Sequence, residues 1–285
     1  MVIGVVSPGA MGSALGASLA RSGHRVVTTL AGRSARTREL AARAPFELLD
    51  DLPAVTAVSD IVLSVVPPGE ATAVADAAAG TPLLVDMNAV SPMTIDLVSD
   101  TVTGSGTELV DGSISGPPPW QPGTTRIYLS GPRADEVADL EFDGVEVRVV
   151  SDQIGAASAV KMCTASVYKG TALILIHALV TAERNSVLDA VRDDLERSFP
   201  ELMGGIERYL ASSASKAHRY VAEMREISAT QDAAGLPPDV FAAMAVAYEQ
   251  ISRSPAGSDT PEQAATEALL VDVLTRLSPA APGHG

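Results

Sequence analysis

The chain of 285 residues has a single cysteine, few basic residues and no long apolar run. That cysteine, Cys163, excludes a framework of disulfides and is typical of a protein that works in the reducing cytoplasm. Acidic residues outnumber basic ones by 35 to 20, and the net charge of −15 argues against nucleic acid or an anionic membrane as a partner. The longest apolar run, residues 171–182, has only about twelve residues and is too short to span a bilayer. We therefore expect a compact cytoplasmic protein.

The first 150 residues alternate between short apolar runs and amphipathic helical patterns. Strands are predicted over residues 2–6, 25–30, 58–66, 82–87, 126–130 and 145–150, and helices over residues 10–21, 35–44, 70–79 and from Pro92 onward. This alternation is typical of an α/β fold with a Rossmann-type doubly wound parallel sheet. From residue 151 to residue 285 helical patterns dominate, so we predict an all-α second domain. Its last part is predicted to form one helix over residues 262–277 and a disordered end.

The loop after the first predicted strand carries the pattern Ser7-x-Gly9-x-x-Gly12. The usual dinucleotide fingerprint has glycine at the first position, and Ser7 can make the same turn provided that its φ stays negative. Gly9 would let the backbone approach a phosphate, and Gly12 would let the helix pack closely on the strand. The helix that begins at Ala10 would place its free N–H groups beneath a pyrophosphate. Residues 1–150 are therefore predicted to bind a dinucleotide, with no targeting segment before them.

The second predicted strand lacks the acidic residue that normally binds the ribose 2′-OH of NAD. The segment after it instead carries Gly32, Arg33, Ser34 and Arg36, in a chain whose net charge is strongly negative. Arg33 and Ser34 are suited to a 2′-phosphate, because guanidinium groups bind phosphate through charge-assisted hydrogen bonds. The alternative is a solvated face of the following helix. The pattern favours NADP over NAD.

Three later segments extend this pattern. Residues 85–92 read VDMNAVSP, residues 111–116 read DGSISG, and residues 155–161 read GAASAVK. Together with the AMG of residues 10–12 they resemble, in order and spacing, motifs of the β-hydroxyacid dehydrogenase and 6-phosphogluconate dehydrogenase-like reductases. Residues 216–227 resemble the C-terminal domain of a poorly characterised subgroup of these enzymes, which have imine reductases among their relatives. The resemblance implies an N-terminal Rossmann domain, an all-helical C-terminal domain, and a substrate loop at residues 111–116.

The resemblance also implies that Lys161 is the catalytic general acid/base, and that Ser115 and Gly116 contact the substrate. The residues themselves favour this role for Lys161, because a lysine in an apolar helix is partly desolvated, which lowers its pKa towards the working pH. The alternative is a lysine whose stem lies along the surface with its amine in water. The chain has only three lysines, so each of them is conspicuous. Ser-Gly is also common in ordinary turns.

The chain departs from the family pattern at Ala165, where the family carries an asparagine four residues after its lysine. Substrate binding must therefore differ from that of a standard hydroxyacid dehydrogenase. Three prolines precede Trp120, the only tryptophan, which is either a substrate wall or a buried anchor. Substrate contacts are predicted for Ser115, Gly116, Trp120, Thr164, Tyr168 and Lys169; cofactor contacts for Ser7, Pro8, Gly9, Ala10, Met11, Gly12, Gly32, Arg33, Ser34, Arg36, Val66, Pro67, Pro68 and Asn88; no metal ligands are predicted.

These observations predict an NADP-dependent oxidoreductase that transfers a hydride between nicotinamide and a small hydroxy or carbonyl substrate. One alternative is an NADPH-dependent imine reductase, although such enzymes usually have Asp or Tyr at the catalytic position. Another is a non-catalytic NADPH-binding sensor. The helix that starts near Gly155 is apolar around most of its circumference, and one chain has too few helices to cover it. This helix and the resemblance together imply a homodimer formed through the substrate-binding helical domain, residues 151–285.

Overall fold

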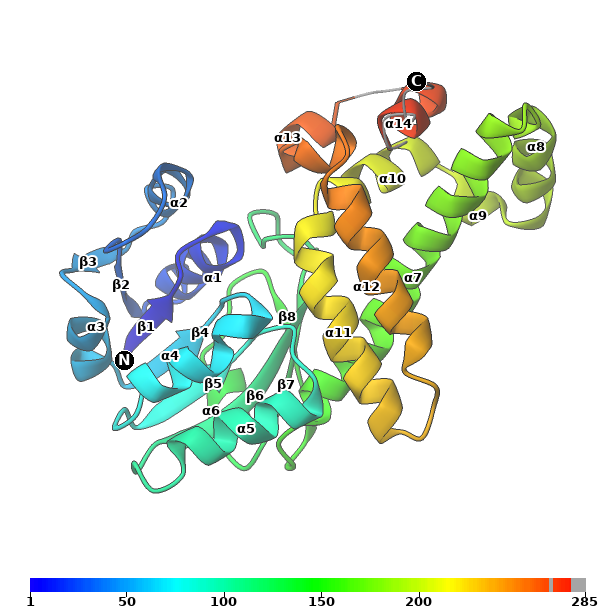
Figure 1. The fold of residues 1–285 in the computed structure, drawn as a ribbon. Helices are drawn as coiled ribbons and strands as arrows, with labels where there is room; N and C mark the ends of the chain where they lie inside the picture. The colour runs from blue at the N-terminus through cyan, green and yellow to red at the C-terminus, as the bar shows by residue number, and fades with distance from the viewer. Residues whose placement is uncertain (267–268, 278–285) are drawn as a thin grey trace. The chain divides into compact units, whose positions relative to one another are not determined.

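The computed structural model of the protein describes residues 1–266 and 269–277. The chain divides into two compact units after Met162. Among the described residues, the first unit contains all the strands, and the second consists of helices and the loops that connect them (Figure 1). The last strand ends at Ser151, close to the predicted change of character near residue 150, whereas the division between the units falls later, inside a helix.

Eight strands form one sheet in the first unit, in the order β3-β2-β1-β4-β5-β6-β7-β8 (Figure 1). The strands are β1 Val2–Val6, β2 Arg25–Thr29, β3 Glu47–Leu49, β4 Ile61–Ser64, β5 Leu83–Asp86, β6 Glu108–Ser115, β7 Arg126–Ser130 and β8 Glu146–Ser151. The predicted Rossmann-type fold is confirmed. The sheet is parallel from β3 to β6, as predicted, but at one edge β7 pairs antiparallel with β6, which was not predicted, and β8 pairs parallel with β7. The connection over residues 116–125 carries no helix and is too short for a parallel crossover.

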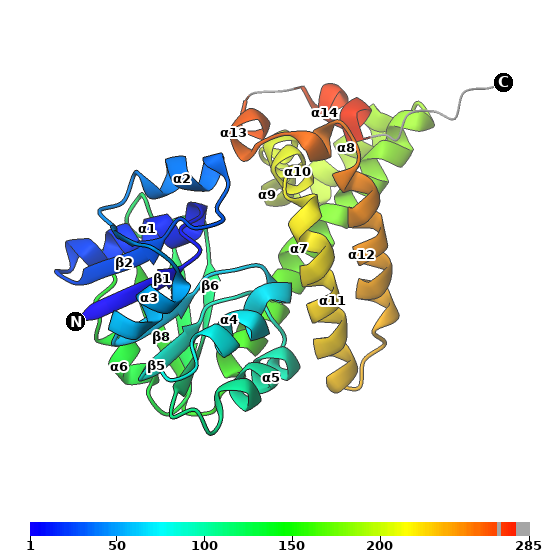
Figure 2. The same cartoon turned by 60° about the vertical axis from the view of Figure 1, so that its left-hand side comes forward.

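Helices cover both faces of this sheet (Figure 2). The helices of this unit are α1 Ala10–Arg21, α2 Ala35–Ala41, α3 Leu52–Val58, α4 Ala71–Ala77, α5 Pro92–Val102 and α6 Ala134–Ala138. Leu15 and Leu19 of α1 join Val137 of α6 in the core on one face. Val74 of α4 and Ile95 of α5 belong to the core on the other face. The sheet is therefore buried between two helical layers. A site must then form at the edge where the parallel strands have their carboxyl ends.

Several elements differ from the prediction in this unit. The bounds of β1, α1 and β7 are as predicted, but the short elements β3, α3 and α6 were not predicted. The strand predicted over residues 58–66 begins only at Ile61, because the Asp51 carboxylate accepts the Ala54 N–H at 2.9 Å and caps a helix that runs to Val58. Residues 111–116, predicted as a loop, lie in β6 as far as Ser115.

The second unit begins within α7 Ala156–Arg184, a helix of 29 residues that crosses the division between the units. The prediction of a long helix from near Gly155 is confirmed. The other helices are α8 Leu188–Ser198, α9 Pro200–Met203, α10 Ile206–Ala214, α11 Ala217–Ala233, α12 Asp239–Ser252, α13 Pro261–Ala264 and α14 Leu270–Leu277. The one helix predicted over residues 262–277 is wrong, because Thr260 caps a single turn that ends at Ala264 before α14 begins. The predicted disordered end, residues 278–285, lies outside the described residues.

By length and composition α7 could cross a membrane, but core helices of soluble proteins share both properties, so this is weak evidence. Leu175 and Leu179 on α7 are buried, whereas Val167 and Ile174 are 64% and 60% exposed. Within one chain α7 is therefore buried on one side only.

Candidate cofactor-binding and catalytic site

The turn between β1 and α1 has the shape of a phosphate-binding loop. Ser7 lies in the left-handed region with a φ of +70°, so the prediction of a negative φ is wrong. Glycine usually provides this conformation at the first position of the fingerprint. The Ser7 carbonyl accepts the Gly9 N–H at 2.8 Å, which closes a tight turn around Pro8. A Cβ on Gly12 would lie 2.3 Å from the Ser7 oxygen, so this position requires glycine. The space in front of Gly9 is open and no side chain caps α1, as a loop that takes an anion requires.

A second binding feature follows β2, where Gly32 turns the chain with a φ of +68°. The Nε of Arg33 is buried, and it has no hydrogen-bond acceptor in the part of the chain that the structure describes. A buried donor without an acceptor is costly, so this nitrogen is suited to an anionic ligand. The Ser34 hydroxyl accepts the Thr37 N–H at 3.2 Å and caps α2, and Arg36 is exposed on that helix.

Asn88 joins the ends of β4 and β5 at the same edge of the sheet. Its Oδ1 accepts the Val66 N–H at 2.6 Å, and its Nδ2 donates to the Ser64 hydroxyl at 2.9 Å and to Asp86 at 2.7 Å. These bonds hold the loop of residues 66–68, so the structure brings together four predicted cofactor residues. Because β1, β4 and β5 are parallel neighbours, this loop lies at the edge that also carries the Ser7 turn.

Two buried acids lie side by side on neighbouring strands, Asp86 at the end of β5 and Asp111 in the middle of β6. Asp86 and Asp111 are register partners, and their exposed fractions are 1% and 0%. Burial, assisted by the charge of Asp111, raises the pKa of Asp86 to about 7 against the donors of Asn88. Burial also raises the pKa of Asp111, against hydrogen bonds that include those from Ser158. Sequence reasoning gave these acids no role, although an acid that ends an apolar strand was a visible signal.

Lys161 lies in the second turn of α7, beside the end of β6. Its Nζ donates to the Ile114 carbonyl at 2.6 Å. Burial lowers the pKa of Lys161, which favours release of its proton. Ser115 is the next residue of β6, and Gly116 then turns the chain with a φ of +114°. The structure therefore brings the predicted catalytic pair, Lys161 and Ser115, to one place.

Trp120 packs against a residue that follows α2. The Arg43 guanidinium carbon lies 4.6 Å from the centroid of the Trp120 ring, and the ring is half-buried. The Thr125 hydroxyl donates to the Pro117 carbonyl at 2.5 Å and closes the loop between them. A cation–π contact of this kind suits an anchor, and the substrate-wall role of Trp120 stays a prediction.

Three predicted substrate residues, Thr164, Tyr168 and Lys169, lie on α7 in the second unit. The Lys169 amine forms an ion pair with Glu223, and it also lies 4.6 Å from the centroid of the Tyr220 ring. Lys169 is therefore engaged within the helical unit, and its contact with substrate stays a prediction.

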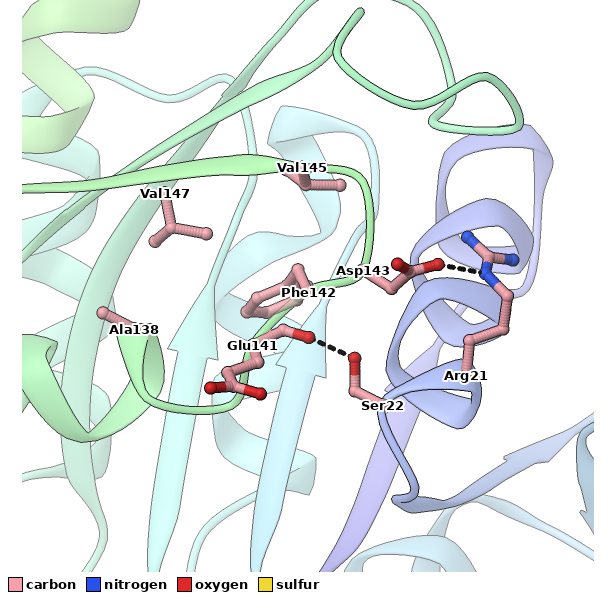
Figure 3. Close-up of a pocket in the computed structure, with 8 residues that line it drawn as sticks. All are labelled: Arg21, Ser22, Ala138, Glu141, Phe142, Asp143, Val145 and Val147. Atoms are coloured by element: carbon pink, nitrogen blue, oxygen red, sulfur yellow. Dashed lines mark hydrogen bonds and ion pairs between the residues drawn. The ribbon is translucent and has the colours of Figure 1, made fainter.

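A pocket of about 500 Å³ lies at the opposite end of α1 from the Ser7 turn (Figure 3). Arg21 and Ser22 line it from the end of α1. The other lining residues come from the end of α6, the connection to β8 and β8 itself: Ala138, Glu141, Phe142, Asp143, Val145 and Val147. Arg21 pairs with the Asp143 carboxylate, and the Ser22 hydroxyl donates to the Glu141 carbonyl. None of the predicted site residues lines this pocket.

Two family models match parts of the chain. Residues 1–95 match a Rossmann-like domain, and residues 182–251 match a domain of unknown function (DUF1932). Among curated proteins, an uncharacterised 28.5 kDa protein of Methanothermus fervidus is 29% identical over 175 residues, which are 61% of this chain and 68% of that protein.

Solved structures resemble the chain over nearly its whole length. A conserved protein of unknown function, described as similar to 3-hydroxyacid dehydrogenases, is 26% identical, with a TM-score of 0.68 and coverage of 94% of this chain and 100% of that one. The 3-hydroxyisobutyrate dehydrogenase of Mycobacterium tuberculosis is 18% identical, with a TM-score of 0.68, and the match covers 98% of this chain and 99% of that one. An imine reductase of Myxococcus stipitatus in complex with NADP⁺ is 18% identical, with a TM-score of 0.58, and the match covers 96% of this chain and 100% of that one. The chain has the fold of the 3-hydroxyacid dehydrogenases and imine reductases.

The predicted resemblance to these reductases is thereby confirmed. Within this fold, the Ser7 turn, Arg33 and Asn88 fall inside the Rossmann-like match. Asp111 and Lys161 lie between the two family matches, so their roles must be argued from their surroundings.

Proposed function

We propose that the protein is an NADP-dependent oxidoreductase that transfers a hydride between nicotinamide and a small hydroxy or carbonyl substrate. The observation that carries this proposal is the placement of Lys161. Its desolvated amine lies at the Ile114 carbonyl, one residue from Ser115 and on the unit that also holds the Ser7 turn. Solved relatives of the same fold include a 3-hydroxyisobutyrate dehydrogenase and an imine reductase bound to NADP⁺, which supports the class of reaction.

The residues at this edge of the sheet fit NADP. The open space at Gly9 and the N-terminus of α1 would accept the pyrophosphate. Arg33 would bind the 2′-phosphate, whose oxygens would satisfy its buried Nε. The segment after β2 offers no acid for a ribose 2′-OH before Glu39, so it does not fit NAD equally well. When bound, NADPH supplies the hydride.

The protein's own residues would orient the substrate and transfer the proton. Ser115 and the N–H groups near Gly116 would orient the substrate oxygen. During reduction, the Lys161 ammonium gives one proton to the carbonyl oxygen while the carbonyl carbon receives the hydride, which yields a hydroxyl group. In the reverse direction the neutral amine accepts that proton. Burial lowers the pKa of Lys161 and so makes its neutral form easier to reach than in an exposed lysine.

An NADPH-dependent imine reductase is the second candidate function. Ala165 lies where a standard hydroxyacid dehydrogenase of the resembled family carries asparagine, and imine reductases share the fold. Both reactions need a proton donor, so Lys161 suits either. Oxidation of NADPH with glyoxylate and acetoacetate as carbonyl probes, and with 2-methyl-1-pyrroline as an imine probe, separates the two: turnover of the imine alone would favour the second candidate.

The choice of cofactor is tested by Arg33→Ala. Loss of a charged phosphate contact costs about 1.5–3 kcal/mol, so we expect NADPH to bind roughly tenfold more weakly or worse, and NADH to bind as before. Isothermal titration calorimetry with each cofactor measures both affinities. Arg25→Ala is the matched control, because Arg25 pairs with Glu47 on β3 and belongs to no proposed site. Equal affinity of the unmodified protein for NADPH and NADH would contradict the proposal.

A further inference from the structure

The Asp111 carboxylate joins β6 to the first turn of α7. Its Oδ2 accepts the backbone N–H groups of Gly155 at 3.0 Å and Ser158 at 2.9 Å, and its Oδ1 accepts the Ser158 hydroxyl at 2.7 Å. Asp111 and Ser158 are both fully buried. The carboxylate therefore caps α7 from a distance in sequence, since Gly155, the residue before the helix, is 44 residues farther along the chain. A negative charge at a helix N-terminus also interacts favourably with the helix dipole.

Two buried serines strengthen the same junction. The Ser130 hydroxyl donates to Asp111 at 3.0 Å and accepts the Ala157 N–H at 2.9 Å. The Ser113 hydroxyl donates to the Ala157 carbonyl at 2.8 Å. Ser113 and Ser130 are 1% and 0% exposed, so water does not compete for these bonds. The position of α7 along β6 is therefore set by the four hydrogen bonds to Asp111 together with two bonds of Ser113 and Ser130 with the backbone of Ala157.

Lys161 depends on that position. It follows Ser158 by less than one helical turn, and the carbonyl that its amine contacts, Ile114, lies on β6 just beyond Asp111. We propose that Asp111 is a positioning residue for Lys161, which holds the first turn of α7 on β6 and so keeps the lysine amine in its desolvated place at the Ile114 carbonyl. The inference rests on the proposed function in one respect, that Lys161 is the proton donor.

The groups around Asp111 include no competing ion pair for its carboxylate among the described residues. The titratable group that faces it is Asp86, its register partner on β5, and its other contacts come from serine hydroxyls and backbone N–H groups. No basic side chain pairs with Asp111 among the described residues. The charge is thus balanced by helix and hydroxyl donors alone, and loss of the carboxylate leaves these donors without an acceptor.

The test measures the pKa of Lys161 directly, with no substrate or cofactor. The chain has three lysines, so lysine labelled with ¹³C at Cε gives three NMR signals, and Lys161→Arg identifies one of them. Because burial lowers the pKa of Lys161, a looser first turn of α7 should admit water and raise it. We expect Asp111→Ala to raise it by more than about half a pH unit, Asp111→Asn by less since one oxygen can still accept, and Ser158→Ala by least.

The controls separate positioning from simple loss of stability. Asp51→Ala removes the cap of α3, an exposed helix end that does not carry Lys161, and should leave all three lysine signals unchanged. Lys169 and Lys216 should keep their pKa values in every variant. If Asp111→Ala does not fold, Asp111→Asn and Ser158→Ala decide. A lowered Tm with an unmoved Lys161 pKa in these variants would overturn the inference. Failure of the proposed function would show separately, as unimpaired turnover by Lys161→Ala.

Discussion

At the scale of single residues, the charged groups at the sheet edge are unusual because they are buried without salt-bridge partners. Asp86, Asp111 and the Nε of Arg33 share this property among the described residues. Two of them are satisfied by hydrogen bonds from Asn88, Ser158 and backbone groups, whereas the Arg33 nitrogen is not. Such groups cost stability, and they are retained where binding or chemistry needs them.

Asp86 makes stability depend on pH in a predictable direction. Its pKa is about 7 in the folded protein against an ordinary aspartate value of 3.8, so the folded protein holds a proton that the unfolded chain loses. This stabilisation is fully present below about pH 4 and is lost as the pH rises through about 7, by at most about 1.4 kcal/mol per pH unit.

Asp86→Asn should therefore flatten the pH dependence of the free energy of unfolding between about pH 4 and pH 7. Urea unfolding at several pH values measures it, and Asp76→Asn on the exposed face of α4 serves as the control. A slope in Asp86→Asn equal to that of the unmodified protein would contradict the assignment.

At the scale of elements, the spacing of apolar residues was enough to predict the long and regular helices and strands. The bounds of β1, α1 and β7 follow from apolar runs and helical spacing, and α7 from its length. The elements β3, α3 and α6 were missed because each is too short to show a period. Residues 111–116 of β6 were taken for a loop because the resemblance implies a substrate loop there, and their polar residues gave no strand pattern to oppose it. Hydrogen bonds to α7 explain the polar residues Asp111 and Ser113 in this strand. β7 pairs antiparallel with β6 because the connection over residues 116–125 contains no helix and is too short for a parallel crossover. The sequence motifs did not predict this.

The Ser7 turn is an element whose strain can be measured. A left-handed conformation costs a residue with a Cβ about 1–2 kcal/mol, and glycine avoids this at a smaller cost in the unfolded chain. Ser7→Gly should raise the free energy of unfolding by about 0.5–1 kcal/mol, and Ser7→Val should lower it, because a β-branched side chain fits this region poorly. Thermal unfolding followed by circular dichroism ranks the three proteins. A more stable valine variant would show that the turn does not have this conformation.

At the scale of the whole molecule, α7 leaves apolar side chains uncovered in one chain. Val167 and Ile174 lie two turns apart on it, and both are more than half exposed. An apolar stripe of this kind on a helix is typical of a surface that a partner covers. We propose that the partner is a second copy of the chain, which the sequence also predicts.

Light scattering at micromolar concentration should then give twice the 29.3 kDa of one chain. Val167→Glu combined with Ile174→Glu should give a folded monomer, because two buried and unpaired charges would oppose association. Val58→Glu, at an exposed apolar residue of α3, should remain a dimer. An unmodified protein of 29.3 kDa would contradict the proposal.

Lys161→Ala tests the central claim most directly, when turnover and cofactor affinity are measured on the same preparation. General acid/base groups contribute about 10²–10⁴-fold to turnover. With the probe that the unmodified protein reduces fastest, we predict that kcat for NADPH oxidation falls by about that factor, while calorimetry gives the same Kd for NADPH. A variant that keeps more than about a tenth of the original kcat would show that Lys161 does not carry the proton.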